Sequence, residues 1–378
     1  MTNTQKVLLE HLASSLFGKP TKEEITKEVI SEALDQAVAT LLPIDNYAFY
    51  WGLVRSNVKV TVAHQRLHEL MSRHGIPYVI LKGLASASHY TDPDRRQMGD
   101  VDFIVKPEDF ERTYNALTSE GFHGSEDKHE HHVRFETDFG VWELHWKAPG
   151  IPEGNAAEKY LEQIVDQAVA YDGCMIPSDF HHGLVILAHS AHHWINSGIG
   201  LRHLCDWAVF YARFSDDEFC SMFEKALKEA GLWKYARIIT AACITYLGAP
   251  PRQWVGDVSA DYVSQVMEDI HESGNFGCKD GERLNQAKLM TDGKDMTVND
   301  TGMLKQIIKA LAAKAQVQWP LFKKCPILLP FGVIGIAIRH VFKVLQNKRP
   351  QIHVKQMLTG AQERKAIYRD FSLFQPEK

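Results

Sequence analysis

The spacing of apolar residues along the first 75 positions predicts helices. Apolar side chains fall at helical spacing in two groups: Val7, Leu8 and Leu12, then Val29, Leu34, Val38 and Leu41. A longer helix is expected over 46–74, because basic residues followed by a glycine at 73–75 are typical of a helix end. We therefore expect an N-terminal helical section over residues 1–75.

The hydrophobic period shortens after residue 76. Four runs have the composition or alternation of strands, at 77–81, 100–105, 133–136 and 141–146. The last two are separated by Asp138-Phe139-Gly140, which predicts a hairpin. Short helices are expected at 84–90 and 107–121. This alternation predicts a small mixed sheet with flanking helices over residues 76–150.

The chain becomes mostly helical again after residue 152. Helical spacing predicts helices at 156–170, 178–195, 201–213, 217–230, 233–247, 261–271, 302–315 and 332–346. The stretch 272–302 is rich in Gly, Asp, Asn and Lys and is expected to be a loop or linker. We expect a helical domain over 151–302, a helical tail over 303–378 packed on the body, and an α+β fold overall.

Composition narrows the class of protein. The 378 residues favour two domains, and 45% hydrophobic with 24% charged residues is ordinary for a soluble protein. With a net charge of −5, the chain does not have the overall basic excess that is typical of a nucleic-acid binder, although the sequence does not exclude a local basic patch. Six scattered cysteines argue against a cysteine zinc site and a dense disulfide framework. With no evident signal peptide and no apolar run long enough for a membrane span, we expect a cytoplasmic protein.

The C-terminal section combines apolar and basic residues. Apolar Ile334, Ile338, Val341 and Leu345 stand among Lys323, Lys324, Arg339, Lys343, Lys348 and Arg349. A basic amphipathic helix can contact a membrane surface or a nucleic acid. A helix docked on the body with its charges in water has the same pattern, and we favour that interpretation.

Asp100 and Asp102 are the most informative residues. Residues two apart on a strand point to one face, so both carboxylates would leave one side of the run 100–105. Adjacent carboxylates repel each other, and a cation between them removes that cost. The pair alone is a weak signal. With Lys82-Gly83 upstream and Glu143 downstream, it favours a metal site.

This order of motifs resembles the nucleotidyltransferase superfamily that includes DNA polymerase β. The matching pieces are a strand ending in Lys82-Gly83, the strand with Asp100 and Asp102, and a later strand with a third acid, Glu143. The pattern is closest to the uncharacterised bacterial nucleotidyltransferases of the NTP-transferase 5 type, with related patterns in toxin nucleotidyltransferases of abortive-infection systems. The residues that carry this closer resemblance are Lys82, Gly83, Tyr90, Arg96, Glu143, His145 and Trp146.

The resemblance implies a polymerase-β-like core and a role for each residue. Asp100, Asp102 and Glu143 would hold Mg²⁺, or Mn²⁺ in its place, and Glu143 would help to deprotonate an acceptor hydroxyl. Lys82, Gly83 and Arg96 would meet the phosphates of an NTP such as ATP. For Lys82 a solvated strand end, and for Arg96 a structural partner of an acid pair, are equally open interpretations.

Two residues depart from the family pattern. Leu84 stands where the glycine turn has a second small residue, which in the superfamily lets the backbone approach the phosphates. The third acid is Glu143 rather than an aspartate, and its longer side chain shifts the metal geometry. The metal half of the pattern is therefore complete, whereas the phosphate half is unusual.

Several polar residues are candidates for contacts with the acceptor or the cleft: His145, His189, His193, Arg202 and Asp206. His189 and His193 share a helix face, a spacing that can bind a metal, but packing or a cleft-lining role is the favoured interpretation. Arg202 and Asp206 also stand four apart, which is typical of a surface ion pair. The histidine-rich run 126–132 favours a mobile charged loop.

Three functions remain open on the sequence. The first is a Mg²⁺-dependent nucleotidyltransferase that moves NMP from an NTP to a hydroxyl-bearing acceptor, whether a small molecule, a protein or a tRNA. The second is a non-catalytic nucleotide-binding or scaffolding protein of the same fold, which Leu84 motivates. The third is a metal-dependent hydrolase that uses the helical histidines.

Overall fold

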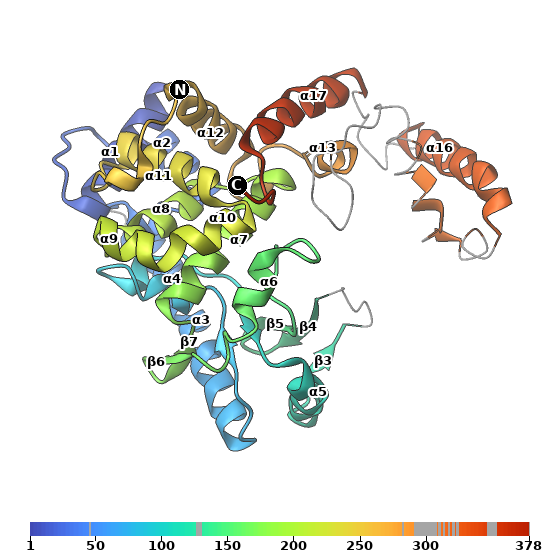
Figure 1. Ribbon diagram of the computed structural model, residues 1–378, viewed down its shortest axis with the longest axis horizontal. Coiled ribbons are helices and arrows are strands. Elements are labelled where there is room, and N and C mark those ends of the chain that lie inside the picture. The colour runs from blue at the N-terminus through green and yellow to red at the C-terminus, as the bar shows by residue number, and fades with distance from the viewer. Residues whose placement is uncertain are drawn as a thin grey trace.

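A small mixed sheet lies beneath a larger body of helices (Figure 1). The computed structural model describes residues 1–44, 47–125, 131–281, 283–290, 308, 311–312, 314–316, 318–319, 322, 325–345 and 354–377. The predicted α+β fold is confirmed, and helices both precede and follow the strands of the sheet along the chain.

The sheet has the order β1-β2-β5-β4-β3. Its strands are β1 (Val79–Ile80), β2 (Val101–Ile104), β3 (His123–Gly124), β4 (His132–Thr137) and β5 (Gly140–His145). β2 runs parallel to β5, while the other neighbours are antiparallel. The four predicted strands and the hairpin are confirmed, and β3 is an additional edge strand.

The two faces of the sheet have different neighbours. Val101, Phe103, Trp142 and Leu144 are buried in one apolar cluster with residues of α3 (Tyr47–Arg73) and α5 (Phe110–Ser119). Strand alternation directs Asp102, Glu143 and His145 to the opposite face. On that side Val79, Leu81 and Ile104 belong to the core of the helical body. The polar face of the sheet is therefore turned toward the helices.

The helical body is built around α7, α8 and α11, which pack on one another. Its helices are α1 (Asn3–Phe17), α2 (Lys27–Asp35), α6 (Ala156–Leu161), α7 (Asp179–Ile195), α8 (Leu201–Tyr211), α9 (Asp216–Phe219), α10 (Lys225–Ala230), α11 (Trp233–Leu247) and α12 (Ala260–Ser273). A short helix, α4 (Leu84–Ala87), follows β1 and contacts α8. Glycines in left-handed conformation end α1, α10 and α11.

Two predictions about secondary structure were wrong, and one helix of the predicted helical tail was not placed. The helix expected over 156–170 ends at Leu161, and the chain then forms a second, two-stranded sheet of β6 (Val169–Tyr171) and β7 (Cys174–Ile176). The expected linker at 272–302 contains α13 (Arg283–Met290). The chain also has a helix that the spacing did not reveal, α17 (Val354–Phe371). Residue 302, the expected domain boundary, lies outside the described residues.

The two C-terminal helices differ in their surroundings. α17 packs on α13, and Tyr368 donates a hydrogen bond of 2.6 Å to the carbonyl oxygen of Trp194 on α7. α16 (Leu329–Leu345) lies apart from the body (Figure 1) and exposes Phe331, Ile334 and Ile338. Of the basic residues predicted here, Lys323, Lys324, Lys348 and Arg349 lie outside the described residues. None of the described helices combines the length and apolar character that a membrane crossing requires.

Candidate functional site

Lys82 and Asp102 are joined by an ion pair at the end of β1. Antiparallel pairing brings the end of β1 beside β2, and the backbone N–H of Leu81 donates to the carbonyl oxygen of Asp102. The Lys82 ammonium then lies 2.8 Å from Oδ1 of Asp102. The predicted phosphate-binding lysine is thus positioned on the predicted metal-binding acid.

The turn at Gly83 requires a glycine. Its φ is +62°, in the left-handed region, and a Cβ at this position would lie 3.1 Å from the ring of His64. His64 comes from α3 and is fully buried. Leu84, the departure from the family pattern, is buried in the cluster beneath the sheet. The side chain of Leu84 therefore packs in the core.

Asp102 and Glu143 form the centre of the site. They stand at the same register on the adjacent parallel strands β2 and β5. Nε2 of His145 lies 3.3 Å from Oδ1 of Asp102 and 3.6 Å from Oε2 of Glu143. Burial opposes ionisation of Asp102, but Lys82 and His145 outweigh it and hold the pKa of that carboxyl well below its ordinary value. Asp102 is accordingly ionised at neutral pH.

Asp100 lies just before β2 and not on it, in contrast to the prediction that both aspartates share the strand. The residue is exposed. Partial desolvation of its carboxyl, followed by the negative charges of Asp102 and Glu143, raises the pKa of Asp100. The charges of Asp102 and Glu143 therefore act on Asp100, as the metal-site hypothesis requires.

The donor atoms of His132, Glu143 and His145 lie within 4.8 Å of one another, close enough for one ion. It is the one such group of three among the residues that the structure describes. His132 opens β4 and stands opposite His145 in the sheet. The sequence placed it in a charged loop, of which residues 126–130 lie outside the described chain. Alternation in the hairpin was the signal that could have placed it on the strand.

The donor set suits a divalent cation by its chemistry. The carboxylates of Asp100, Asp102 and Glu143 supply the oxygen ligands that Mg²⁺ prefers, while the neighbouring imidazoles of His132 and His145 suit Mn²⁺ or Zn²⁺. The mutual repulsion that raises the pKa of Asp100 is also what a cation would relieve. The residues present thus fit a metal ion in this position.

Arg96 lies away from solvent and pairs with Asp206. Its Nε and one terminal nitrogen contact the two carboxylate oxygens of Asp206 at 3.0 and 2.6 Å. The hydroxyl of Tyr90 donates to the same carboxylate at 2.8 Å. Asp206 therefore pairs with Arg96 and not, as the spacing on α8 suggested, with Arg202. The arrangement favours the interpretation of Arg96 as a structural partner of a buried acid.

Arg202 is the arginine beside the acids. It donates to the carbonyl oxygen of Gln97 at 3.3 Å, three residues before Asp100, and its positive charge lowers the pKa of Asp100 against the acids around it. Burial, followed by the charge of Arg96, lowers the pKa of Arg202 to about 10. Arg202 remains a cation at neutral pH, and its charge acts on Asp100.

His189 and His193 of α7 pack together with their ring centroids 4.3 Å apart. His203 of α8 lies 6.2 Å from each of them by the same measure. Burial and then the charge of Lys82 lower the pKa of His189. Within the described chain these histidines do not join a three-donor metal group. This geometry does not favour the hydrolase hypothesis.

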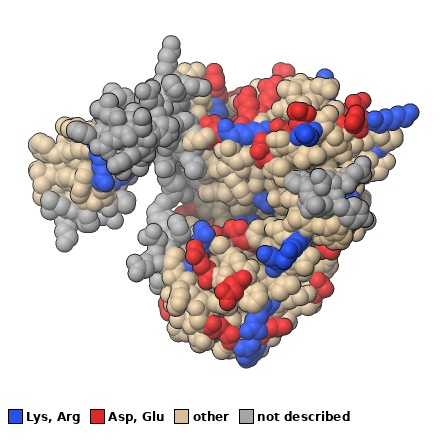
Figure 2. Space-filling view, turned by 180° about the vertical axis from the view of Figure 1, so that it is seen from behind, with Lys and Arg blue, Asp and Glu red and all other residues tan. Residues whose placement is uncertain are grey.

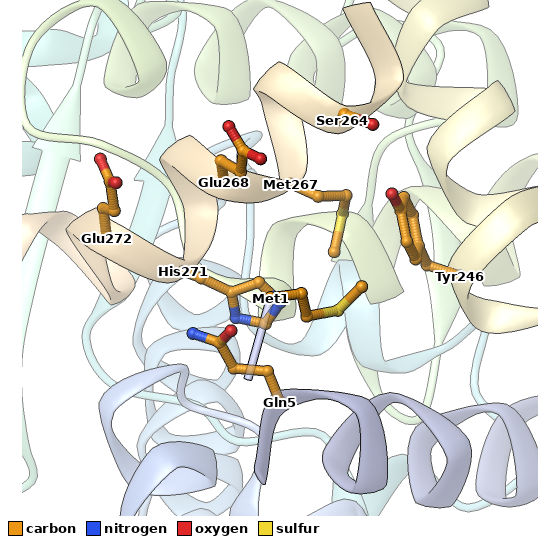
Figure 3. A pocket seen from close by; sticks show the side chains of 8 residues that line it. All are labelled: Met1, Gln5, Tyr246, Ser264, Met267, Glu268, His271 and Glu272. Carbon is orange, nitrogen blue, oxygen red and sulfur yellow. The ribbon is translucent and has the colours of Figure 1, made fainter. Parts of the chain in front are cut away.

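Figure 2 shows a hollow between the helical part and the part that contains the sheet, with acidic and basic side chains at its edge. A separate cavity of about 310 Å³ lies between the N-terminus, α11 and α12 (Figure 3). It is lined by Met1, Gln5, Tyr246, Ser264, Met267, Glu268, His271 and Glu272, none of which belongs to the candidate site. The candidate chemistry therefore lies at the junction of sheet and helices.

The comparisons with known proteins agree with this location. A family model described as an uncharacterised nucleotidyltransferase matches residues 46–248, from the start of α3 to the end of α11. The matched region contains all the predicted site residues. A search of curated proteins returned no match.

Proposed function

Because this chain belongs to the uncharacterised nucleotidyltransferase family, we propose that it transfers NMP from an NTP to a hydroxyl-bearing acceptor with the help of Mg²⁺ or Mn²⁺. The observation that carries the proposal is the register of Asp102 and Glu143 on parallel strands, with Lys82 on one of the two carboxylates. Asp100, next to the start of β2, supplies the third carboxylate.

Each residue has a distinct task in this proposal. Asp100, Asp102 and Glu143 would hold the cation, which neutralises triphosphate charge and lowers the pKa of a hydroxyl bound beside it. Glu143, the more exposed of the two strand acids, accepts the proton of the acceptor hydroxyl. His145 orients both strand carboxylates through Nε2.

Lys82 and Arg202 are the cations that can meet the triphosphate. The Lys82 side chain is about one-quarter exposed, and its ammonium can contact both Asp102 and a phosphate oxygen. Arg202 takes the role that the resemblance gave to Arg96, whose guanidinium is already committed to Asp206. Arg96 instead supports the segment that leads to Asp100.

The acceptor is proposed by class alone: a small molecule, a protein side chain or a tRNA end that carries a hydroxyl. We further propose a cytoplasmic location, and a surface contact through the exposed apolar stripe of α16 with its exposed Arg339.

Labelled NTPs test the proposal directly. The wild-type chain with Mg²⁺ and candidate acceptors is expected to give labelled product, whereas Asp102→Asn gives none. Calorimetric titration with Mg·NTP provides a readout that needs no acceptor. Absence of binding by the wild-type chain at millimolar nucleotide would contradict the proposal.

A non-catalytic nucleotide-binding protein is the second candidate. It is favoured by Asp102, whose Oδ1 is shared between Lys82 and His145, and by the burial of Leu84. That function predicts NTP binding with equal affinity in the presence of Mg²⁺ and of EDTA, and no turnover with any acceptor. The same titration therefore separates the two candidates.

A further inference from the structure

Phe276 is an exposed aromatic side chain on a strained backbone. It lies in the turn Asn275–Gly277 after α12, with φ +56° and ψ 32° in the left-handed region, and 42% of its surface is exposed. This conformation costs a bulky residue on the order of 1–3 kcal/mol, and burial of the ring does not offset that cost. Such strain is typical of residues whose orientation serves a ligand.

The turn is fixed by close packing against the start of α8. A Cβ on Gly200 would lie 2.9 Å from Cα of Asn275, and a Cβ on Gly277 would lie 2.3 Å from the carbonyl oxygen of Ser197. Both contacts are with backbone atoms, so neither neighbour could move aside cheaply. The backbone that carries Phe276 is therefore held in one place.

Three side chains of α7 and α8 surround the ring. Its centroid lies 4.7 Å from that of His193 and 5.2 Å from that of His203, while Cζ of Arg202 lies 5.4 Å from it. These contacts are edge-to-face or cationic, and 42% of Phe276 still faces solvent. The result is an aromatic surface beside a group of polar side chains.

Buried polar atoms without hydrogen-bond partners gather here. Nδ1 of His189, Nδ1 of His203, Nε of Arg202 and Oδ1 of Asn275 all lack a partner within the described part of the chain. His189 and His203 are more than nine-tenths buried. Each such atom costs free energy that a bound polar group would recover. The set contains both donors and acceptors.

The cluster adjoins the candidate catalytic acids. Arg202 connects Phe276 to the carbonyl of Gln97, and its charge reaches Asp100. On the other side, the charge of Lys82 reaches His189 and His193. We take this as the direction in which the base of a nucleotide held at Lys82 would extend.

We propose that Phe276 is the stacking surface for the nucleobase of the donor NTP, and that His189 and Asn275 contact the edge of that base. This inference rests on the proposed function. A planar ring and a mixed set of donors and acceptors suit a base, whereas phosphates call for cations. Burial, followed by the charge of Lys82, lowers the pKa of His189 well below its ordinary value, so its imidazole is neutral at pH 7 and can both donate and accept a hydrogen bond.

The test compares a nucleotide with a ligand that has phosphates but no base. Affinities for Mg·tripolyphosphate and for Mg complexes of ATP, GTP, CTP and UTP are measured by calorimetry on the full chain. Phe276→Asn removes the ring and favours the left-handed backbone, so its Tm is expected to equal or exceed that of the wild type. Affinity for the preferred NTP is expected to fall roughly tenfold, with tripolyphosphate affinity unchanged.

Two further variants sharpen the comparison. Phe139→Asn removes an exposed ring from the β4–β5 turn and should leave all affinities unchanged. Phe276→Leu keeps an apolar side chain without the aromatic plane and should repeat the selective loss of NTP affinity, whatever the stability of Phe276→Asn.

Three results would overturn the inference. NTP affinity that is unchanged in both Phe276 variants excludes stacking and leaves the proposed function intact. Equal losses for NTP and tripolyphosphate would show that Phe276 supports the fold or the phosphates. A wild-type chain that binds neither NTP nor tripolyphosphate removes the proposed function together with the inference.

Discussion

Asp102 and Glu143 stand directly opposite each other on two parallel strands, on the face of the sheet that is turned toward the helical body. Residues in register on adjacent strands have their side chains close together on one face. Two carboxylates in that position repel each other. Lys82 forms an ion pair with one of them, Asp102. The remaining excess of negative charge is the electrostatic basis for the cation site proposed above.

Neutralising Glu143 should separate activity from stability. In Glu143→Gln the pKa of Asp100 falls toward its ordinary value because one of the charges that raise it is gone. We expect nucleotidyl transfer to drop by about 10²–10³-fold, while Tm stays equal or rises. Transfer is measured with labelled NTP and Tm by scanning calorimetry.

The matched control for that variant is Glu136→Gln. Glu136 lies on β4 in the same sheet, is exposed, and faces Arg134 at 3.9 Å. It should leave both transfer and Tm unchanged. Transfer by Glu143→Gln within threefold of the wild-type rate would rule out Glu143 as the third acid.

The ion pair between Arg96 and Asp206 should be structural. Both side chains are buried and make two hydrogen bonds to each other, so removal of one partner leaves a buried charge unpaired. Asp206→Asn is expected to lower the free energy of unfolding by about 3–5 kcal/mol, measured by urea denaturation. The folded fraction should still bind Mg·tripolyphosphate with wild-type affinity.

A double substitution gives the control for this pair. Arg96→Met with Asp206→Leu removes both charges and should destabilise less than the sum of the single changes. A strong loss of tripolyphosphate affinity in Arg96→Met, at temperatures where that variant is folded, would restore Arg96 as a phosphate ligand.

The strands and the positions of the acids were predictable because they depend on local pattern. The alternation around Asp102 and Glu143 fixes which side chains share a face, and the sheet has the expected face assignments. The start of β2 after Asp100 was not predictable. A strand begins where its backbone hydrogen bonds to the neighbouring strands begin, and composition does not record that position. Helical spacing predicted Arg202 as the partner of Asp206, but Asp206 pairs instead with Arg96, which lies far away in the sequence.

Residues that act through tertiary contacts left no signal in the sequence. His64 lies on α3, at a position that the sequence pattern assigns to the apolar face of the helix. Its contact with Gly83 joins two segments that are far apart in the sequence. Phe276 lies in a stretch whose Gly, Asp and Asn content predicted a loop. Left-handed backbone at a phenylalanine can be found only in the structure.

Acid should destabilise the fold through His64. Burial lowers the pKa of this histidine to about 4 from an ordinary value of 6.5. Between these two pH values the unfolded state binds more protons than the folded state, so stability falls as the pH falls from 6.5 to 4. The full loss from this group is on the order of 3 kcal/mol. Urea denaturation at half-unit pH steps measures it.

His64→Leu isolates that contribution. Both ring nitrogens of His64 are buried without a hydrogen-bond partner among the described residues, so an apolar replacement should cost little at pH 7. The variant is expected to be more stable than the wild type at pH 5. His123→Leu, an exposed change on β3, serves as control. A pH slope that His64→Leu leaves unaltered would contradict the prediction.

The mixture of imidazoles and carboxylates should set the metal preference. Donor atoms of His132, Glu143 and His145 lie within 4.8 Å of one another, and imidazole suits Mn²⁺ better than Mg²⁺. We expect the wild-type chain to bind Mn²⁺ more tightly than Mg²⁺ by calorimetry. His132→Gln should weaken Mn²⁺ binding by roughly tenfold and Mg²⁺ binding by less than twofold, because the carboxylates remain. His123→Gln, on β3 of the same sheet, should change neither affinity. Equal weakening of both metals by His132→Gln would show that His132 supports the sheet and does not bind the ion.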